Sequence, residues 1–131
     1  MIYRAVSYDI EVMAEPEFLA NESDPKQGRW FWAYTITIAN HGSKTVQLIS
    51  RHWRITDGHG RVHDVCGAGV VGEQPVIRPG EHYRYTSGCP LDTPQGIMVG
   101  DYQMQSETGD MITVAIPAFS LDSQMKDRVL H

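Results

Sequence analysis

Residues 30–38 read Trp-Phe-Trp-Ala-Tyr-Thr-Ile-Thr-Ile, and their alternation is the clearest structural signal in the chain. The even-numbered positions carry large apolar side chains, whereas Thr35 and Thr37 stand between them. Because successive side chains of a β-strand point to opposite faces, this pattern predicts a strand with one face in a core.

The same two-residue period recurs on both sides of this stretch. Over residues 6–14 every second side chain is apolar, which predicts one half-buried strand. Over residues 46–56 the apolar positions are even-numbered at Leu48 but odd-numbered at Trp53, and a bulge or burial on both faces would explain the slip. Further alternating runs cover residues 61–66, 81–87, 97–106 and 111–116, of which the last either stops there or continues to Leu121.

Polar and glycine-rich turns separate these runs, at residues 40–43, 57–60 and 108–110. No segment before residue 118 has the period of an amphipathic helix. About seven short strands with regular turns are typical of an antiparallel sandwich. We therefore predict an all-β, immunoglobulin-like or fibronectin type III-like antiparallel β-sandwich in a single domain over residues 1–131. Its tail, residues 121–131, is expected to form a frayed turn or a disordered end.

A short pattern around Tyr102 favours the immunoglobulin-like form. Gly100, Tyr102 and Met104 alternate with polar residues, as residues do around a tyrosine corner. In such a corner the phenol hydroxyl bonds to upstream backbone, and the next inward residue fills the core. We therefore expect a backbone partner for the Tyr102 hydroxyl.

Length and charge exclude several classes of protein. The 131 residues suffice for one domain with its own core, and 41% of them are apolar, which is ordinary for a globular chain. The net charge of −5 argues against binding to nucleic acid, which needs a basic footprint. The charge is uneven, at +1 over residues 45–90 and −4 over residues 91–131. An anionic ligand would therefore fit the middle of the chain best, although scattered surface charge explains the same numbers.

The termini and the cysteines indicate an ordinary cytoplasmic protein. No apolar run approaches the length of a membrane span, so no membrane insertion is expected, and the first residues lack the pattern of a secretory signal. Cys66 and Cys89 are the chain's two cysteines. In a reducing compartment we expect them as buried or partly buried free thiols rather than as a disulfide.

The sharpest motif is Gly-Ala-Gly-Val-Val-Gly at residues 67–72, which has the spacing G-x-G-x-x-G. In a dinucleotide-binding fold this motif opens a helix, but Pro75 and Pro79 follow too closely for one. Two readings are left open. Gly67, Gly69 and Gly72 could expose backbone N–H groups as an anion nest, or the glycines could simply let the chain cross between sheets. In the first case Arg78, or else Arg61 or Arg84, would supply a charge beside the nest, and the candidate binding loop would extend through Pro79 and Gly80.

The other groups of residues give weaker indications of function. His59, His63 and Cys66 invite a metal hypothesis, yet two strand residues four apart lie about 13 Å from each other, so no metal site is predicted. No nucleophile elbow or Cys/His pair suggests catalysis, so no catalytic residues and no cofactor are expected. Trp30, Phe31 and Trp32 place large rings on both faces of one strand, of which one face is either an exposed binding patch or is covered by residues 15–28.

A longer stretch carries a family resemblance. Residues 67–88 resemble the signature of the ApaG family, as they read Gly-Ala-Gly-Val-Val-Gly-Glu-Gln-Pro-Val-Ile-Arg-Pro-Gly-Glu-His-Tyr-Arg-Tyr-Thr-Ser-Gly. The resemblance covers nearly the whole chain. Its further matches are Trp32-Ala33-Tyr34, the alternate residues Trp53, Ile55 and Asp57, the alternate residues Pro94 to Tyr102, and Ile116, Pro117, Phe119 and Leu121.

This resemblance implies a β-sandwich and a thin set of functional associations. Bacterial members have been associated with cobalt resistance and magnesium efflux, and similar domains in eukaryotic proteins are thought to mediate protein–protein interaction. A pyrophosphate-binding role has been suggested for the glycine motif.

We accordingly expect a non-enzymatic binding module for an unidentified protein partner. The alternative is a small-ligand sensor that binds a phosphate-rich nucleotide or a divalent cation through the loop Gly67–Gly72. A homodimer formed by free strand edges is a third hypothesis.

Overall fold

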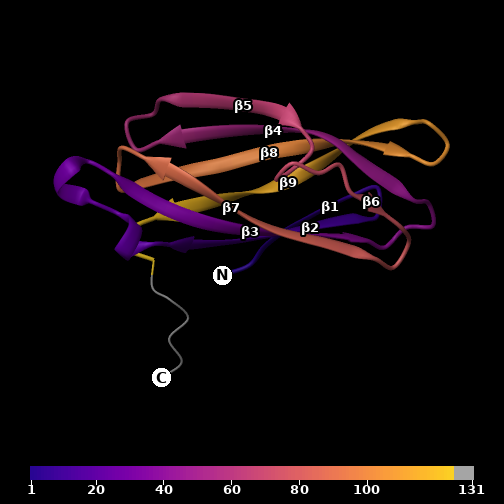
Figure 1. The fold of residues 1–131 in the computed structure, drawn as a ribbon, viewed down its shortest axis with the longest axis horizontal. Coiled ribbons are helices and arrows are strands. Elements are labelled where there is room, and N and C mark those ends of the chain that lie inside the picture. Colours follow the sequence, from indigo (N-terminus) through magenta and orange to yellow (C-terminus); the bar gives the residue numbers. More distant parts are fainter. Residues whose placement is uncertain (126–131) are drawn as a thin grey trace, which may run out of the picture.

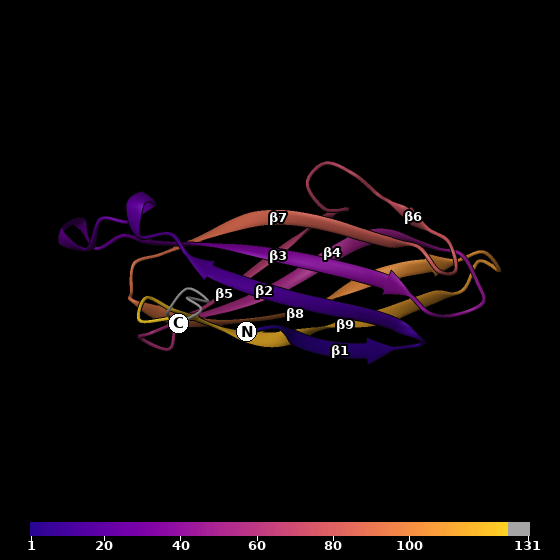
Figure 2. The same cartoon turned by 90° about the horizontal axis from the view of Figure 1, so that it is seen from below.

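Two antiparallel sheets packed face to face form the molecule, and the computed structural model describes residues 1–125 of it (Figure 1). The predicted all-β sandwich is therefore confirmed. The first sheet has the order β1-β2-β3-β7, and Figure 2 shows its four strands side by side in front of the second sheet. Its strands are β1 (Tyr3–Ser7), β2 (Ile10–Phe18), β3 (Trp30–Asn40) and β7 (His82–Leu91).

The second sheet has the order β5-β4-β8-β9, and the two-residue strand β6 also pairs with β4. The connection between β2 and β3 holds two short 3-10 turns, η1 (Ala20–Glu22) and η2 (Pro25–Gln27). No helical element of residues 1–125 is long and apolar enough to cross a membrane. The strands of the second sheet are β4 (Val46–Asp57), β5 (Val62–Ala68), β6 (Val76–Ile77), β8 (Gln95–Ser106) and β9 (Met111–Asp122).

The alternation over residues 30–38 places the core as predicted. Trp32, Tyr34, Ile36 and Ile38 are all buried and face the second sheet's buried side chains, while Thr35 and Thr37 are on the other face. Burying each of these large side chains contributes roughly 1.5–3 kcal/mol. The strand that the sequence indicated most clearly therefore supplies much of one inner face.

The phase slip in β4 is a bulge. The register against β8 skips Ile49, so that Leu48 pairs with Met104 and Ser50 with Gln103. Even-numbered residues point inward before the bulge and odd-numbered residues after it, and Trp53 is accordingly 3% exposed.

The prediction of one strand over residues 6–14 is wrong. Tyr8 and Asp9 form a two-residue turn, with φ angles of 52° and 62°, between β1 and β2. Positive φ at both central residues is the geometry of a type I′ hairpin, which is usually marked by glycine or asparagine, and Tyr8-Asp9 carries neither. Val6 and Tyr8 are exposed as a result.

The prediction of a tyrosine corner at Tyr102 is also wrong. Tyr102 is fully buried, as the pattern indicated, but its hydroxyl bonds to the hydroxyl of Tyr85 rather than to upstream backbone. Met104 does fill the core. The tail prediction concerns residues 121–131, of which Leu121 and Asp122 end β9 and residues 126–131 lie outside the described part.

The two long sides of the sandwich differ. On one side β1 lies against β9 of the other sheet, where the backbone N–H of Ala115 donates to the Ser7 hydroxyl (Figure 2). On the other side, β5 and β7 are the outer strands, and within residues 1–125 each pairs with one neighbour only. Strands β1 and β9 also end their sheets, but they lie against each other, whereas β5 and β7 do not.

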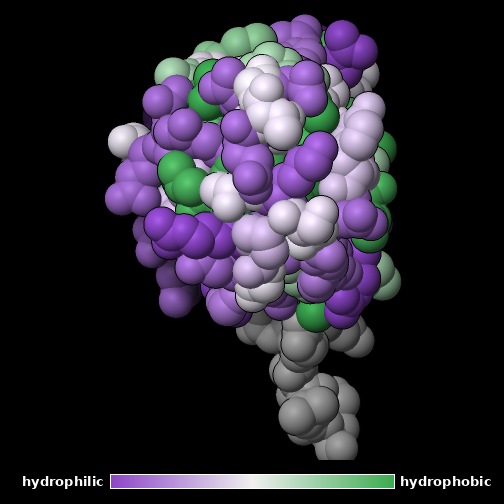
Figure 3. Space-filling view, turned by 90° about the vertical axis from the view of Figure 1, so that its right-hand side faces the viewer, coloured by the Kyte–Doolittle hydropathy of each residue, from purple (hydrophilic) through white to green (hydrophobic). Residues whose placement is uncertain are grey.

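The end of the sandwich that faces right in Figure 1 is formed by connections between strands. Its surface is mostly hydrophilic, with hydrophobic side chains scattered among polar ones (Figure 3).

Candidate functional site: a groove between two strand edges

A groove of about 670 Å³ lies between β5 and β7. This volume is within the range of ligand-binding clefts. Its apolar lining comes from both sheets and includes Trp53, Ile55 and Met98 from the second, Leu91 from the first, and Val65 at the rim. The remaining lining residues are Gly28, Arg29, Tyr34, Arg51, Asp57, His63, Ser87, Gly88, Cys89, Pro90 and Asp92.

Arg51 lies where this groove meets a smaller cavity beside the glycine loop. Four residues line both spaces, namely Tyr34, Arg51, Trp53 and Ser87. The Arg51 guanidinium donates from Nη1 to the carbonyl of Ala68 at 3.1 Å and to that of Gly69 at 2.7 Å. It also lies so close to Gly67 that a Cβ there would be 2.9 Å from Nη1. The half-buried guanidinium is thus fixed at one end of the groove.

Two tyrosines, Tyr34 and Tyr85, line the smaller cavity together with this cation. Burial raises the pKa of Tyr34, and the Ser87 hydroxyl and the charge of Arg51 act in the opposite direction. Burial likewise raises the pKa of Tyr85 and Tyr102, whose hydroxyls lie 2.6 Å apart. At neutral pH these groups are protonated, so they offer hydrogen bonds and no negative charge.

The buried carboxylate of Asp57 lines the other end of the groove. Its Oδ1 accepts the backbone N–H groups of His59 at 2.8 Å and Arg61 at 3.0 Å, and its Oδ2 lies 3.8 Å from His63 Nε2. Burial acts to raise the pKa of Asp57, but these backbone N–H groups and the charge of Arg61 outweigh burial and hold the pKa below its usual value. The carboxylate therefore organises the β4–β5 turn.

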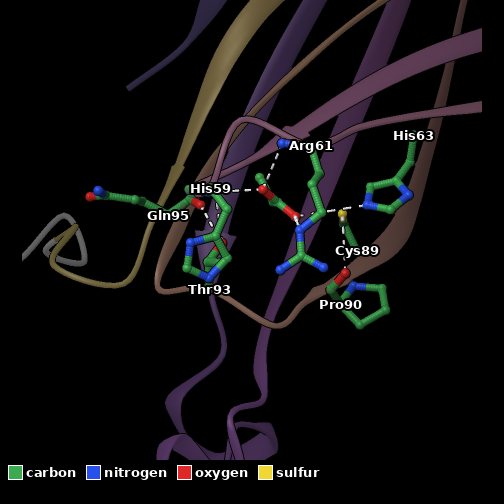
Figure 4. Close-up of polar contacts among 9 residues, drawn as sticks. His59, Arg61, His63, Cys89, Pro90, Thr93 and Gln95 are labelled. Atoms are coloured by element: carbon green, nitrogen blue, oxygen red, sulfur yellow. Dashed lines mark hydrogen bonds and ion pairs between the residues drawn. The ribbon is translucent and has the colours of Figure 1, made fainter.

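Thr93 links that turn to the first sheet. Its hydroxyl accepts the N–H of Gly58 at 2.9 Å and donates to the carbonyl of Gln95 at 2.8 Å (Figure 4). The β4–β5 and β7–β8 connections are thereby held together, which fixes the width of the groove at this end.

Comparison with known proteins identifies this architecture. A model described as the ApaG domain matches residues 20–106. The protein ApaG of Bradyrhizobium sp. (strain ORS 278) is 57% identical over 99% of this chain and 100% of its own length, and that of Rhizobium meliloti (strain 1021) is 53% identical over the same shares. The chain belongs to the ApaG family. The crystal structure of the putative ApaA protein from Bordetella pertussis, 48% identical, superposes with a TM-score of 0.87 over 91% of this chain and 97% of that one.

In this ApaG family member the glycine loop does not present a free row of N–H groups. The N–H of Gly69 donates to Ile49, and that of Val70 donates to Glu73. No helix follows the motif within the described chain, and the carbonyls of Ala68 and Gly69 face Arg51. Gly67 belongs to β5, while Gly69 and Gly72 have positive φ in the tight turn that follows, which stands out from the sandwich (Figure 2).

Residues 78–80, the second half of the candidate binding loop, form a separate turn. Arg78 pairs with Glu81, its Nη1 lying 3.9 Å from Oε2, and the N–H of Gly80 donates to Asn40. Pro79 lies between them with Gly80 at positive φ. The cation against the glycine motif is thus Arg51 rather than Arg78.

The three consecutive aromatic residues have three different environments. Trp32 is fully buried, so it cannot belong to an exposed face, and Trp30 packs partly buried against the core. Phe31 is half-buried with its ring across Gly88, and its backbone N–H donates to Ser23 of the β2–β3 connection. Of the proposed aromatic face, only the edges of Trp30 and Phe31 reach solvent.

In the described residues the histidines and cysteines do not form a common site. In the described part of the chain no three His, Cys, Asp or Glu side chains are grouped so that they could hold a metal ion. His63 faces Asp57, whereas Cys66 is an exposed free thiol on β5, contrary to the expectation that both thiols would be at least partly buried. Cys89 is buried at the groove with its Sγ 3.9 Å from the carbonyl of Pro90, and burial raises its pKa to about 11.

Sequence reasoning missed Arg51, although a signal was present. After the slip in β4, Arg51 has the same odd-numbered phase as Trp53 and Ile55. A charged residue in the inward phase of an amphipathic strand has either a buried partner or a ligand-facing position. The phase of β4 therefore pointed to Arg51 once its bulge was placed.

Proposed function

We propose that this chain is a cytoplasmic, non-enzymatic binding module that receives an extended segment of a partner protein in the groove between β5 and β7. The proposal rests chiefly on one observation. Two strand edges without a second neighbour, within residues 1–125, border a partly apolar groove of about 670 Å³. An extended peptide can add to such an edge through main-chain hydrogen bonds while its side chains enter the adjoining pocket.

The chemistry of the groove supports binding over catalysis. With a pKa of about 11, the Cys89 thiol is protonated at neutral pH and is a poor nucleophile. His63 is directed to the Asp57 carboxylate, which is itself held by backbone N–H groups (Figure 4). His63 and Asp57 are thus engaged in holding the β4–β5 turn.

Site-specific cross-linking tests this function. A photoreactive phenylalanine analogue at Val65, on the groove rim, should capture a partner in cells, whereas the same analogue at Ile97 should not. Both side chains are exposed, at 41% and 50%, and Ile97 points away from the groove on β8. Peptide mapping should place the Val65 cross-link in an extended segment of the partner.

Three results would reject the proposal. Capture from both positions alike would indicate non-specific contact, and capture from neither would remove the docking role. A product that contains two copies of this chain would replace the partner by a homodimer through these edges.

A second candidate function is a small-ligand sensor for a phosphate-rich nucleotide or a divalent cation. It is supported by the Arg51 guanidinium next to Gly67, although the N–H groups of Gly69 and Val70 are already used. Millimolar ATP, diadenosine tetraphosphate, magnesium or cobalt should then raise the melting temperature. A ligand at about 100 times its Kd would stabilise the chain by about 2.7 kcal/mol. No shift with any of the four would discard tight binding, and with it a direct basis for the cobalt and magnesium associations.

A further inference from the structure

Four arginines of the described residues form ion pairs with carboxylates. Arg4 pairs with Glu11, Arg54 with Asp64, Arg61 with Asp57, and Arg78 with Glu81. No carboxylate within residues 1–125 pairs with Arg51, whose hydrogen bonds go to two backbone carbonyls. A guanidinium has five N–H donors. The half-buried cation of an acidic chain thus has donors left for a ligand.

The surroundings of Arg51 suit an anion with an apolar neighbour. The hydroxyls of Tyr34 and Ser87 line the same space as the guanidinium, and the groove continues from there over Trp53 and Ile55. A charge-assisted hydrogen bond is stronger in such a partly desolvated site than in bulk water.

The register of β4 sets the spacing along the groove. Arg51, Trp53 and Ile55 are alternate residues on the inward side of one strand, so successive positions are about 6.6–6.8 Å apart. An extended segment lying along β4 has the same two-residue spacing. Its side chains can therefore meet a cation, an indole and an aliphatic group at three alternate positions.

We propose that Arg51 binds the carboxylate of an aspartate or glutamate side chain in the docked segment, with apolar residues two and four positions away over Trp53 and Ile55. This inference rests on the proposed function and names the chemistry of the partner. The planar guanidinium matches a carboxylate, and its position fixes the register of the segment.

Selection from a library of displayed random nonapeptides tests the inference. Peptides enriched on the wild-type chain should share an acidic residue at one fixed position, with apolar residues two and four positions from it. Replacing that residue by its amide in a synthetic peptide should weaken binding at least tenfold. This comparison uses only the wild-type chain, so it does not depend on any variant folding.

Protein variants supply the matched control. Arg51→Gln should remove the acidic preference, and Arg51→Lys, which keeps the charge but not the fork, should retain part of it. Arg54→Gln, on the opposite side of the same strand, should leave the preference unchanged.

The outcomes separate the two proposals. Enriched peptides without an acidic preference would overturn the role of Arg51 while leaving the docking function intact. Equal losses from Arg51→Gln and Arg54→Gln would also overturn it, since general electrostatic attraction would then suffice. If no peptide is enriched, the docking function itself fails. Displacement of enriched peptides by phosphate or ATP, without an acidic preference among them, would assign Arg51 to a small anion instead.

Discussion

The hydroxyls of Tyr85 and Tyr102 lie 2.6 Å apart in the interior, where they join β7 of one sheet to β8 of the other. Each phenol hydroxyl is the hydrogen-bond partner of the other. The bond crosses the core close to Arg51, whose charge acts on the pKa of both. A polar link between sheets therefore stands next to the proposed anion site.

Removing one hydroxyl of this pair should destabilise the fold. We expect Tyr102→Phe or Tyr85→Phe to lower the free energy of unfolding by about 1–3 kcal/mol, because the remaining buried hydroxyl loses its partner. The double variant should cost less than the sum of the two single changes. Urea unfolding followed by fluorescence measures all four proteins, and strictly additive losses would show that the hydroxyls do not depend on one another.

Gly69 should be far less replaceable than Gly72. Both have positive φ, at 60° and 81°, but a Cβ at Gly69 would overlap the backbone carbonyl of Glu73, whereas a Cβ at Gly72 meets nothing within 4 Å. We expect Gly69→Ala to cost about 3 kcal/mol or more, and Gly72→Ala about 1–2 kcal/mol from backbone strain alone. Thermal unfolding compares the two, and equal losses would contradict the close packing of this turn.

The stability of the chain in acid should depend on Asp57. Its folded-state pKa is depressed by backbone N–H groups and Arg61 against the effect of burial, so its contribution is present above the unfolded pKa of about 3.9. That contribution is lost as the pH falls through the lower, folded-state pKa. Asp57→Asn should be less stable at pH 7, and its melting temperature should fall less than that of the wild type between about pH 5 and pH 2.

Asp101→Asn is the matched control for this experiment. It removes the same charge from β8, and the Asp101 side chain makes no hydrogen bond or ion pair with other described residues. Its pH profile should follow the wild type. A profile of Asp57→Asn parallel to the wild type would show that the turn does not depend on the ionised carboxylate.

The two thiols should react at very different rates. Cys66 is exposed on β5, whereas Cys89 is buried with a pKa raised to about 11. We expect iodoacetamide to label Cys66 first and Cys89 at least about tenfold more slowly, since the thiolate is the reactive form. Mass spectrometry of digested protein separates the sites, and Cys66→Ser should abolish the fast phase. Fast labelling of Cys89 in that variant would mean that the groove opens readily.

The fold was predictable wherever the two-residue period was long. Residues 30–38 and 97–106 formed strands as their alternation indicated, and the turn at residues 57–60 joined β4 to β5. The hairpin at Tyr8 and Asp9 escaped prediction because its positive φ angles occur at residues other than glycine. Strand β6 is two residues long, which is too short for any period to appear.

The groove was harder to predict because it belongs to no single segment. Its walls combine Tyr34, Trp53, Val65 and Leu91, which are brought together by the order of strands in two sheets. The glycine motif indicated the right region, since Gly67 lies against Arg51. Its N–H groups, which composition could not place, turned out to be largely engaged within the protein.

The extra residue in β4 sets the parity of everything that follows it in that strand. If Ile49 were paired regularly instead of bulged, His52 and Arg54 would take the inward places, and Trp53 would face water. One backbone unit thus determines both which residues fill the hydrophobic interior and which cation enters the groove. A change that straightened the bulge without removing a residue would therefore turn an entire half-strand over, whereas deletion of Ile49 itself would leave Arg51 and Trp53 on the inner face.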